Sequence, residues 1–128
     1  MRHNTLADAF SMLKNFEKIG RPECSVKASN LVKDVLEVMK KHGYIQDAEY
    51  VEDGKGGVYR VKLTKRINDC NVILPHFDVR LSDLAKYEKR YLPAFNIGLL
   101  ILTTSKGVMG HNQARQEGTG GRLLGYVY

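Results

Sequence analysis

The stretch over residues 97–121, IGLLILTTSKGVMGHNQARQEGTGG, constrains the fold of this chain more than any other. Its apolar run ends abruptly in hydroxyl, lysine and glycine residues, which predicts a buried strand over residues 96–104, central in its sheet. A short helix over residues 111–117 and a closing strand at RLLGYVY are expected to follow. Because the short helix separates two glycine-rich segments, we expect both segments near the same end of the sheet.

Periodicity and capping residues predict two helices in the first half. Apolar side chains recur at helical spacing over residues 5–18, which indicates an amphipathic helix. A second helix begins at a cap supplied by Ser29 or Asn30, and Gly43 is well placed to end it.

Strand patterns predict the remaining elements. Two strands, over about residues 44–52 and 58–63, are joined by the turn DGKGG. The segment LTKRINDCNVILP is expected to be a connector, followed by a strand over residues 77–81. Ser82 is a candidate cap for a further helix, which Pro93 stops.

The predicted fold is α+β, with two small subdomains that share an interface. An N-terminal α/β subdomain with the order α-β-α-β-β covers residues 1–66, and a C-terminal subdomain with the order β-α-β-α-β covers residues 67–128. A chain of 128 residues is long enough for one domain or for two such subdomains.

The charge balance suggests a polyanionic partner. Twenty lysine and arginine residues face fourteen acidic residues, which gives a net charge of +6 and a pI near 9.4. Four acidic residues cluster at Asp47, Glu49, Glu52 and Asp53, so the rest of the chain is more basic than the total implies. We expect this acidic cluster on a solvated strand edge and turn, away from an anionic partner.

Composition and motifs argue against a membrane segment, a metal site and catalysis. No stretch approaches the roughly 20 apolar residues of a membrane span, and the N-terminus lacks the apolar core of a signal peptide. Cys24 and Cys70 match no zinc or CxxC spacing, which predicts reduced thiols in an intracellular protein. The GKGG of residues 54–57 lacks the other residues of a phosphate-binding P-loop, and GTGGRLLG precedes a strand where a dinucleotide site needs a helix.

The TTSKG segment, residues 103–107, is the best candidate for binding. Short hydroxyls hydrogen-bond to phosphate, sugar and base edges, the lysine adds a positive charge, and the glycine lets a backbone come close. An ordinary β-to-α turn would contain the same residue types. For the second glycine cluster, its residues taken alone favour a structural explanation, with Gly118 as a helix C-cap and Gly120 and Gly121 as a tight return to a strand.

The motifs resemble those of one family. LTTSKGVMGHNQARQEGTGGRLLGYVY resembles the C-terminal signature of the universal small-subunit ribosomal protein eight family, in its archaeal and eukaryotic form. ADAFSMLKNFEK is similar to the first helix of that family, VMKKHGYI to its helix-to-strand junction, and CNVILPHFDV to the entry into its second half. The resemblance covers essentially the whole chain.

The resemblance implies a structural, non-enzymatic protein of the small ribosomal subunit in the cytosol. Family members bind the central domain of small-subunit rRNA early in assembly and help to organise the platform, beside neighbouring small-subunit proteins. It implies no cofactor, metal, membrane contact or small-molecule substrate. The main RNA contacts that it transfers to this chain are Thr103, Thr104, Ser105, Lys106, Gly107, Gly120 and Gly121. The supporting contacts are Asn4, Thr5, Lys14, Asn15, Ser29 and Asn30.

The chain departs from the family pattern at several positions. Residues 28–31 are Ala-Ser-Asn-Leu where relatives have proline, a small residue, serine and lysine, although Lys27 and Lys33 can replace the lost positive charge. His76 stands where an arginine is usual, and Gly110 stands where an aspartate or threonine helix cap is expected.

Two other functions use the same residues. A small enzyme could grip a phosphorylated metabolite with the Ser/Thr/Gly loop, which predicts a deep pocket with several titratable groups around Lys106. A regulator that binds an mRNA mimicking the rRNA site would use the same surface, and the sequence does not separate it from an rRNA-binding protein.

Overall fold

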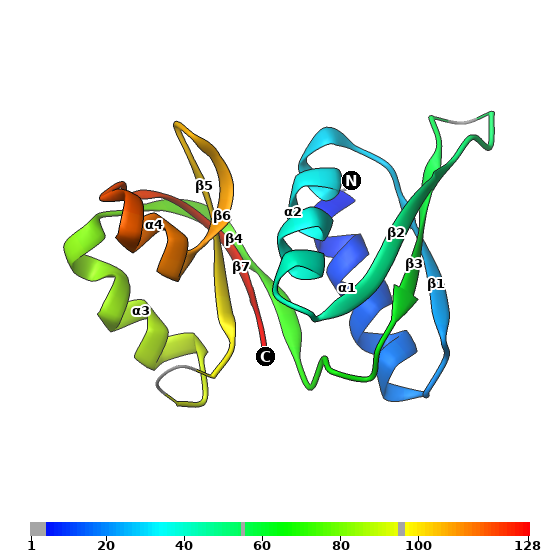
Figure 1. The fold of residues 1–128 in the computed structure, drawn as a ribbon, viewed down its shortest axis with the longest axis horizontal. Coiled ribbons are helices and arrows are strands. Elements are labelled where there is room, and N and C mark those ends of the chain that lie inside the picture. The colour runs from blue at the N-terminus through cyan, green and yellow to red at the C-terminus, as the bar shows by residue number, and fades with distance from the viewer. Residues whose placement is uncertain (1–4, 55, 95–96) are drawn as a thin grey trace. The chain divides into compact units, whose positions relative to one another are not determined.

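The computed structural model describes residues 5–54, 56–94 and 97–128, and the chain forms two compact units, Met1–Asn71 and Val72–Tyr128 (Figure 1). The described residues form two β-sheets and four α-helices, which confirms the α+β class. The sequence-based boundary between residues 66 and 67 lies in the segment that leads into strand β4 (Cys70–Val79), which begins just before the division between the units.

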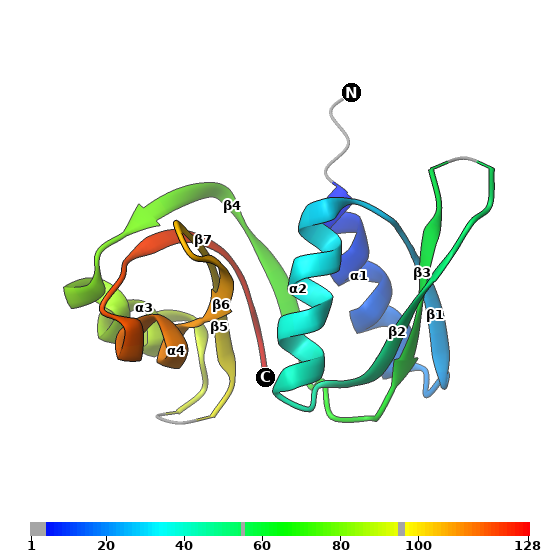
Figure 2. The same ribbon diagram turned by 45° about the horizontal axis from the view of Figure 1, so that its top comes forward.

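The first unit has the predicted order of elements. They are helix α1 (Thr5–Lys18), strand β1 (Glu23–Lys27), helix α2 (Asn30–Lys41), strand β2 (Ile45–Val51) and strand β3 (Val58–Leu63). The strands form an antiparallel sheet in the order β1-β3-β2, and both helices cover the same face of it (Figures 1 and 2). Phe10, Leu13, Leu36 and Met39 of the helices are fully buried in this unit.

The helix ends follow from their capping residues, as predicted. The Ser29 hydroxyl accepts the backbone N–H of Val32 at 3.1 Å and caps α2. Gly43 has a φ of +82°, and the N–H groups of Gly43 and Tyr44 bond to the carbonyls of Lys40 and Met39, which is a Schellman motif.

The other face of this sheet carries charges of both signs. Glu23 pairs in register with Lys62, and Glu49 pairs with Arg60, with all four side chains exposed. Opposite charges on neighbouring strands attract each other weakly and cancel much of the local field. This face is therefore a mixed-charge, solvated surface and not the source of the net positive charge.

The second unit contains one more strand than the sequence predicts. Its elements are strand β4, a 3₁₀ turn (Leu81–Asp83), helix α3 (Leu84–Tyr91), strand β5 (Leu99–Thr104), strand β6 (Gly107–Gly110), helix α4 (His111–Glu117) and strand β7 (Gly121–Val127). The sheet order is β4-β7-β5-β6, and β5 is antiparallel to both of its neighbours. The prediction that the apolar strand lies inside its sheet is confirmed, as are the short helix and the closing strand.

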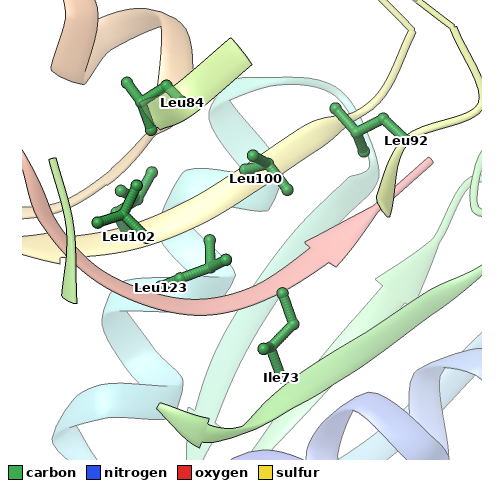
Figure 3. Packing of buried hydrophobic residues seen from close by; sticks show 7 residues of the cluster. Ile73, Leu84, Leu92, Leu100, Leu102 and Leu123 are labelled. Carbon is green, nitrogen blue, oxygen red and sulfur yellow. The ribbon is translucent and has the colours of Figure 1, made fainter. Parts of the chain in front are cut away.

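Leucine and isoleucine side chains form the core of this unit. Figure 3 shows Leu100 and Leu102 of β5 close to Leu123 of β7, with Leu84 of α3 and Ile73 of β4 packed nearby. All five are buried. A strand that contributes large side chains to such a core is held rigidly, so β5 is a firm support for the segment that follows it.

Three predictions for this half were wrong. The connector LTKRINDCNVILP runs into strand β4, which begins at Cys70 rather than at residue 77. Ser82 lies within the 3₁₀ turn, and Asp83 precedes α3 without a side-chain cap hydrogen bond. The segment after the serine and lysine is strand β6, so TTSKG is the tip of a β-hairpin and not a β-to-α turn.

Candidate nucleic-acid interface

The TTSKG segment forms the tip of the β5–β6 hairpin. Thr104 pairs with Gly107 across the hairpin, and Ser105 and Lys106 are the two residues between them. Gly107 has a φ of +117°, a conformation that residues with a Cβ atom rarely adopt. The side chains of Ser105 and Lys106 are exposed at the tip, where they can reach a partner.

The hydroxyl of Thr104 holds this turn together. It donates to the carbonyl oxygen of Gly107 at 2.8 Å and accepts the backbone N–H of Lys106 at 3.1 Å. A hydroxyl that bridges two backbone groups of a turn restricts its conformation. Thr104 therefore positions Ser105 and Lys106, while these two residues present the exposed polar groups.

Gly120 and Gly121 allow backbones to approach closely. A Cβ atom on Gly120 would lie 2.6 Å from the carbonyl oxygen of Val79, and one on Gly121 would collide with the carbonyl oxygen of Thr103. Neither glycine has a positive φ, so their role is close packing of β7 against its neighbours rather than turn formation. Gly118, in contrast, ends α4 with a φ of +67°, as the helix C-cap prediction requires.

The two glycine-rich segments meet at one hollow, which we call the hairpin hollow. Its volume is about 360 Å³ and it is wide open to solvent. It brings together five of the predicted RNA contacts and four other residues. Two of these four belong to β4, one follows β4 directly and one belongs to β7. The lining residues are Thr103, Thr104, Ser105, Gly120, Gly121, Asp78, Val79, Arg80 and Arg122. Lys106 and Gly107 belong to the same hairpin but do not line the hollow.

Sequence reasoning missed the two arginines of the hairpin hollow. Arg122 lies opposite Thr103 on β7, and its Nε atom is 3.5 Å from a carboxylate oxygen of Asp78. Arg80 follows β4 directly and is exposed. The alternation of charged and apolar residues in FDVRL contained the signal, because it puts Asp78 and Arg80 on one face of the chain.

The N-terminal candidates fall into two groups. Thr5 begins α1, Ser29 caps α2 and Asn30 begins it, and the two helix starts lie at the same end of the first unit (Figures 1 and 2). Two parallel helix N-termini favour negative charge near them. Asn4 lies outside the described residues.

Lys14 and Asn15 lie further along α1 and are not brought to the helix starts. The Nζ atom of Lys14 is 2.8 Å from a carboxylate oxygen of Asp69, so its charge is already paired within the unit. The Asn15 side chain is exposed.

The described residues also show the state of the two cysteines, the character of the helices and the start of α4. Cys24 and Cys70 are buried and are not joined by a disulfide bond. Among residues 5–54, 56–94 and 97–128, no helix combines the length and apolar character that crossing a membrane requires. Gly110 precedes α4 and makes no side-chain cap hydrogen bond, because glycine has no side chain.

Comparisons with known proteins agree with the fold and with the signature motifs. The sequence model described as ribosomal protein S8 matches residues 4–128. The small ribosomal subunit protein uS8 of Methanosphaerula palustris is 52% identical over 128 residues, which cover 99% of this chain and 98% of that protein. The uS8 proteins of Methanoregula boonei and Methanococcoides burtonii are 51% and 50% identical, over 99% and 96% of this chain and 98% and 95% of their own lengths. These relatives are archaeal, as the branch-specific motifs predict. The chain therefore belongs to the ribosomal protein S8 family.

Proposed function

We propose that this chain is a structural protein of the small ribosomal subunit that binds the central domain of small-subunit rRNA directly. In this role it binds early in assembly, helps to organise the platform and works in the cytosolic ribosome beside other small-subunit proteins. The observation that supports the proposal best is the convergence of Thr103, Thr104, Ser105, Gly120 and Gly121 on one hollow. The uS8 names of relatives that match nearly the whole chain support the ribosomal setting.

The chemistry of the hairpin hollow suits RNA better than a small ligand. Arg80 and Arg122 line a surface of hydroxyls and glycines, Lys106 lies at the tip of the adjoining hairpin, and cations of this kind hold phosphates. The exposed Ser105 hydroxyl can both donate to and accept from a sugar or a base edge. Because side chains cannot enter the narrow major groove of regular A-form RNA, the target is a distorted segment with accessible base edges.

The rigid parts of the site favour tight binding. Thr104 fixes the hairpin turn, and the glycine contacts fix the distance between β7 and its neighbours. A site whose groups are already ordered loses little conformational entropy when it binds. The start of α1 and the start of α2 form a second, supporting contact in this proposal, with Thr5, Ser29 and Asn30 nearest to the RNA. Lys14 and Asn15 contribute from further along α1.

A phosphate-gripping enzyme fits the hairpin hollow poorly. Such an enzyme needs an enclosed pocket and a pair of groups for proton transfer. The hollow is open, and among its lining residues only Asp78 carries a carboxylate, whose side chain is 86% exposed. We therefore propose a binding role without catalysis and without a cofactor.

A filter-binding titration with the full chain tests the proposal. The probe is a central-domain rRNA fragment, the control is an unrelated RNA hairpin of equal length, and each titration is repeated at several salt concentrations. We expect preferential binding to the fragment, with an affinity that falls as salt rises. Equal affinity for both RNAs, or binding that salt does not change, would overturn the proposal.

A further inference from the structure

A separate cavity of about 550 Å³ lies beside α3 and α4, and we call it the α3–α4 cavity. Its lining residues are Ala85, Glu88, Lys89, Leu92, Pro93, Ala94 and Arg115, none of which lines the hairpin hollow. Its volume is in the range of cavities that hold small organic ligands. Its walls are mostly apolar, because two alanines, a leucine and a proline form them.

Glu88 is a buried acceptor in this cavity. Its side chain is only 10% exposed, and its Oε1 atom contacts the guanidinium of Arg115 and lies 3.6 Å from Nε2 of His111. Both contacts go to Oε1. A carboxylate paired in this way only accepts hydrogen bonds, so a ligand that reaches it must donate one.

Positive charges lie at the edge of the cavity. Lys89 and Arg115 are exposed lining residues, and the exposed charged residues of α3 are all cationic, namely Lys86, Lys89 and Arg90. A ligand that suits this arrangement has an apolar, flat body, a hydrogen-bond donor at one end and a negative charge at the other.

A nucleotide has these three properties. We propose that the α3–α4 cavity binds one unpaired nucleotide of the RNA partner, as a second contact in addition to the hairpin hollow. The base packs against Leu92 and Pro93, its amino group donates to Glu88, and its phosphate lies against Lys89. This inference rests on the proposed rRNA-binding function and adds a subsite to it. An acidic peptide fits less well, because its carboxylates offer Glu88 no hydrogen-bond donor.

Mononucleotides test the subsite directly. AMP, CMP, GMP, UMP and ribose 5-phosphate are titrated into the full ¹⁵N-labelled chain, and the amide shifts of Ala85, Leu92 and Ala94 are followed. We expect the three nucleotides with an exocyclic amino group to bind about fivefold or more tightly than UMP, because uracil presents carbonyl oxygens beside its only ring donor. Ribose 5-phosphate should bind more weakly still. Equal shifts with ribose 5-phosphate, or no shifts at these amides, would overturn the inference.

Variants on α3 provide matched controls. Ala85→Phe places a large side chain in the cavity from an exposed helix position, and should abolish the amide shift changes that the nucleotides cause. Lys89→Ala should weaken nucleotide binding about two- to fivefold. Lys86→Ala removes the same charge from the same helix, but outside the cavity, and should leave nucleotide binding unchanged. Equal losses in the two lysine variants would indicate only a general positive field and would contradict a subsite.

The same variants separate this inference from the proposed function. If Ala85→Phe binds the rRNA fragment as tightly as the parent chain does, the cavity is not an RNA subsite even though the hairpin hollow binds RNA. If an acidic peptide competes with AMP at the cavity and binds more tightly, the cavity is a protein contact and the inference fails. A failure of the filter-binding test with the parent chain instead contradicts the proposed function.

Discussion

The imidazole Nδ1 of His111 accepts the backbone N–H of Leu100 at a distance of 3.1 Å, inside the core of the second unit. Both residues are buried, so no water replaces this hydrogen bond if the imidazole is lost. Because Nδ1 is the acceptor, the ring proton is on Nε2, the atom that faces Glu88. One side chain therefore joins β5 to α4 and to the buried carboxylate of α3.

This relationship predicts the effect of replacing the imidazole. His111→Phe leaves the N–H of Leu100 without an acceptor and should lower the free energy of unfolding by about 1–3 kcal/mol. His111→Gln can present a carbonyl oxygen to the same N–H and should lower it less. Urea denaturation followed by circular dichroism measures both values. Equal stability of His111→Phe and the parent chain would show that this hydrogen bond is unimportant.

Two variants at the hairpin tip should change RNA binding in different ways, one in affinity and the other in the dependence of affinity on salt. Ser105→Ala should weaken specific rRNA binding by about 1–3 kcal/mol at every salt concentration, because an RNA group loses its partner. Lys106→Ala should mainly reduce the slope of log affinity against log salt, by about one unit. Ser25→Ala and Lys62→Ala, on the mixed-charge face of the first unit, are the matched controls. If both hairpin variants change the slope equally, the tip is only an electrostatic patch.

Replacing each of two glycines by alanine distinguishes the effect of a steric clash from the effect of a strained backbone on stability and RNA binding. Gly121→Ala pushes a methyl group against the carbonyl of Thr103, and should both destabilise the fold by about 1–3 kcal/mol and weaken rRNA binding. Gly118→Ala meets open space but must adopt a left-handed conformation, so it should lower stability by about 1 kcal/mol and leave affinity unchanged. Denaturation and filter binding on each variant give the two quantities. A loss of affinity in Gly118→Ala as large as in Gly121→Ala would contradict the assignment of Gly121 to the interface.

Ser29 can be tested as a helix cap and as an RNA contact separately. Ser29→Ala removes the hydrogen bond to Val32 and should lower stability by about 0.5–2 kcal/mol. Ser29→Asp keeps a good cap, so stability should be retained, but the added negative charge should lower rRNA affinity at low salt. Ser25→Asp adds the same charge on the exposed face of β1 and serves as the control. Unchanged rRNA affinity in Ser29→Asp would remove the start of α2 from the interface.

The two thiols should be unreactive in the folded chain. Burial raises the pKa of Cys24 to about 11 and that of Cys70 to about 12, from an ordinary value of 9.0. Because folding raises both values, their contribution to stability is complete below pH 9 and is lost as pH rises through 11 to 12. Iodoacetamide at pH 8 should therefore modify the native chain far more slowly than the urea-unfolded chain. Equal modification rates, measured by mass spectrometry, would contradict this burial.

Helices α1, α2 and α4, which the sequence predicted correctly, have local causes. Helix α1 depends on the spacing of its own apolar residues, and α2 on the cap at Ser29 and the Schellman motif at Gly43. Helix α4 ends at Gly118 for the same kind of reason. In each case the deciding interactions lie within a few residues of the helix end, so a short window of sequence contains them.

The missed features depend on partners far away in the sequence. Strand β6 is a four-residue segment with a glycine at each end, and only its pairing with β5 makes it a strand. Strand β4 contains Pro75 and lies at the edge of its sheet, where a missing N–H is tolerated. The ion pair between Glu88 and Arg115 joins residues 27 positions apart, so no local pattern could reveal it.

The order β4-β7-β5-β6 has a consequence for how the protein is made. The hairpin hollow needs Gly120, Gly121 and Arg122, and β7 fills the position between β4 and β5. The first unit uses only residues up to Asn71, so it can fold while later codons are still being translated. A nascent chain consequently has no completed hollow until β7 has left the exit tunnel. Under the proposed function, the chain can therefore bind RNA through the hollow only after translation has passed β7.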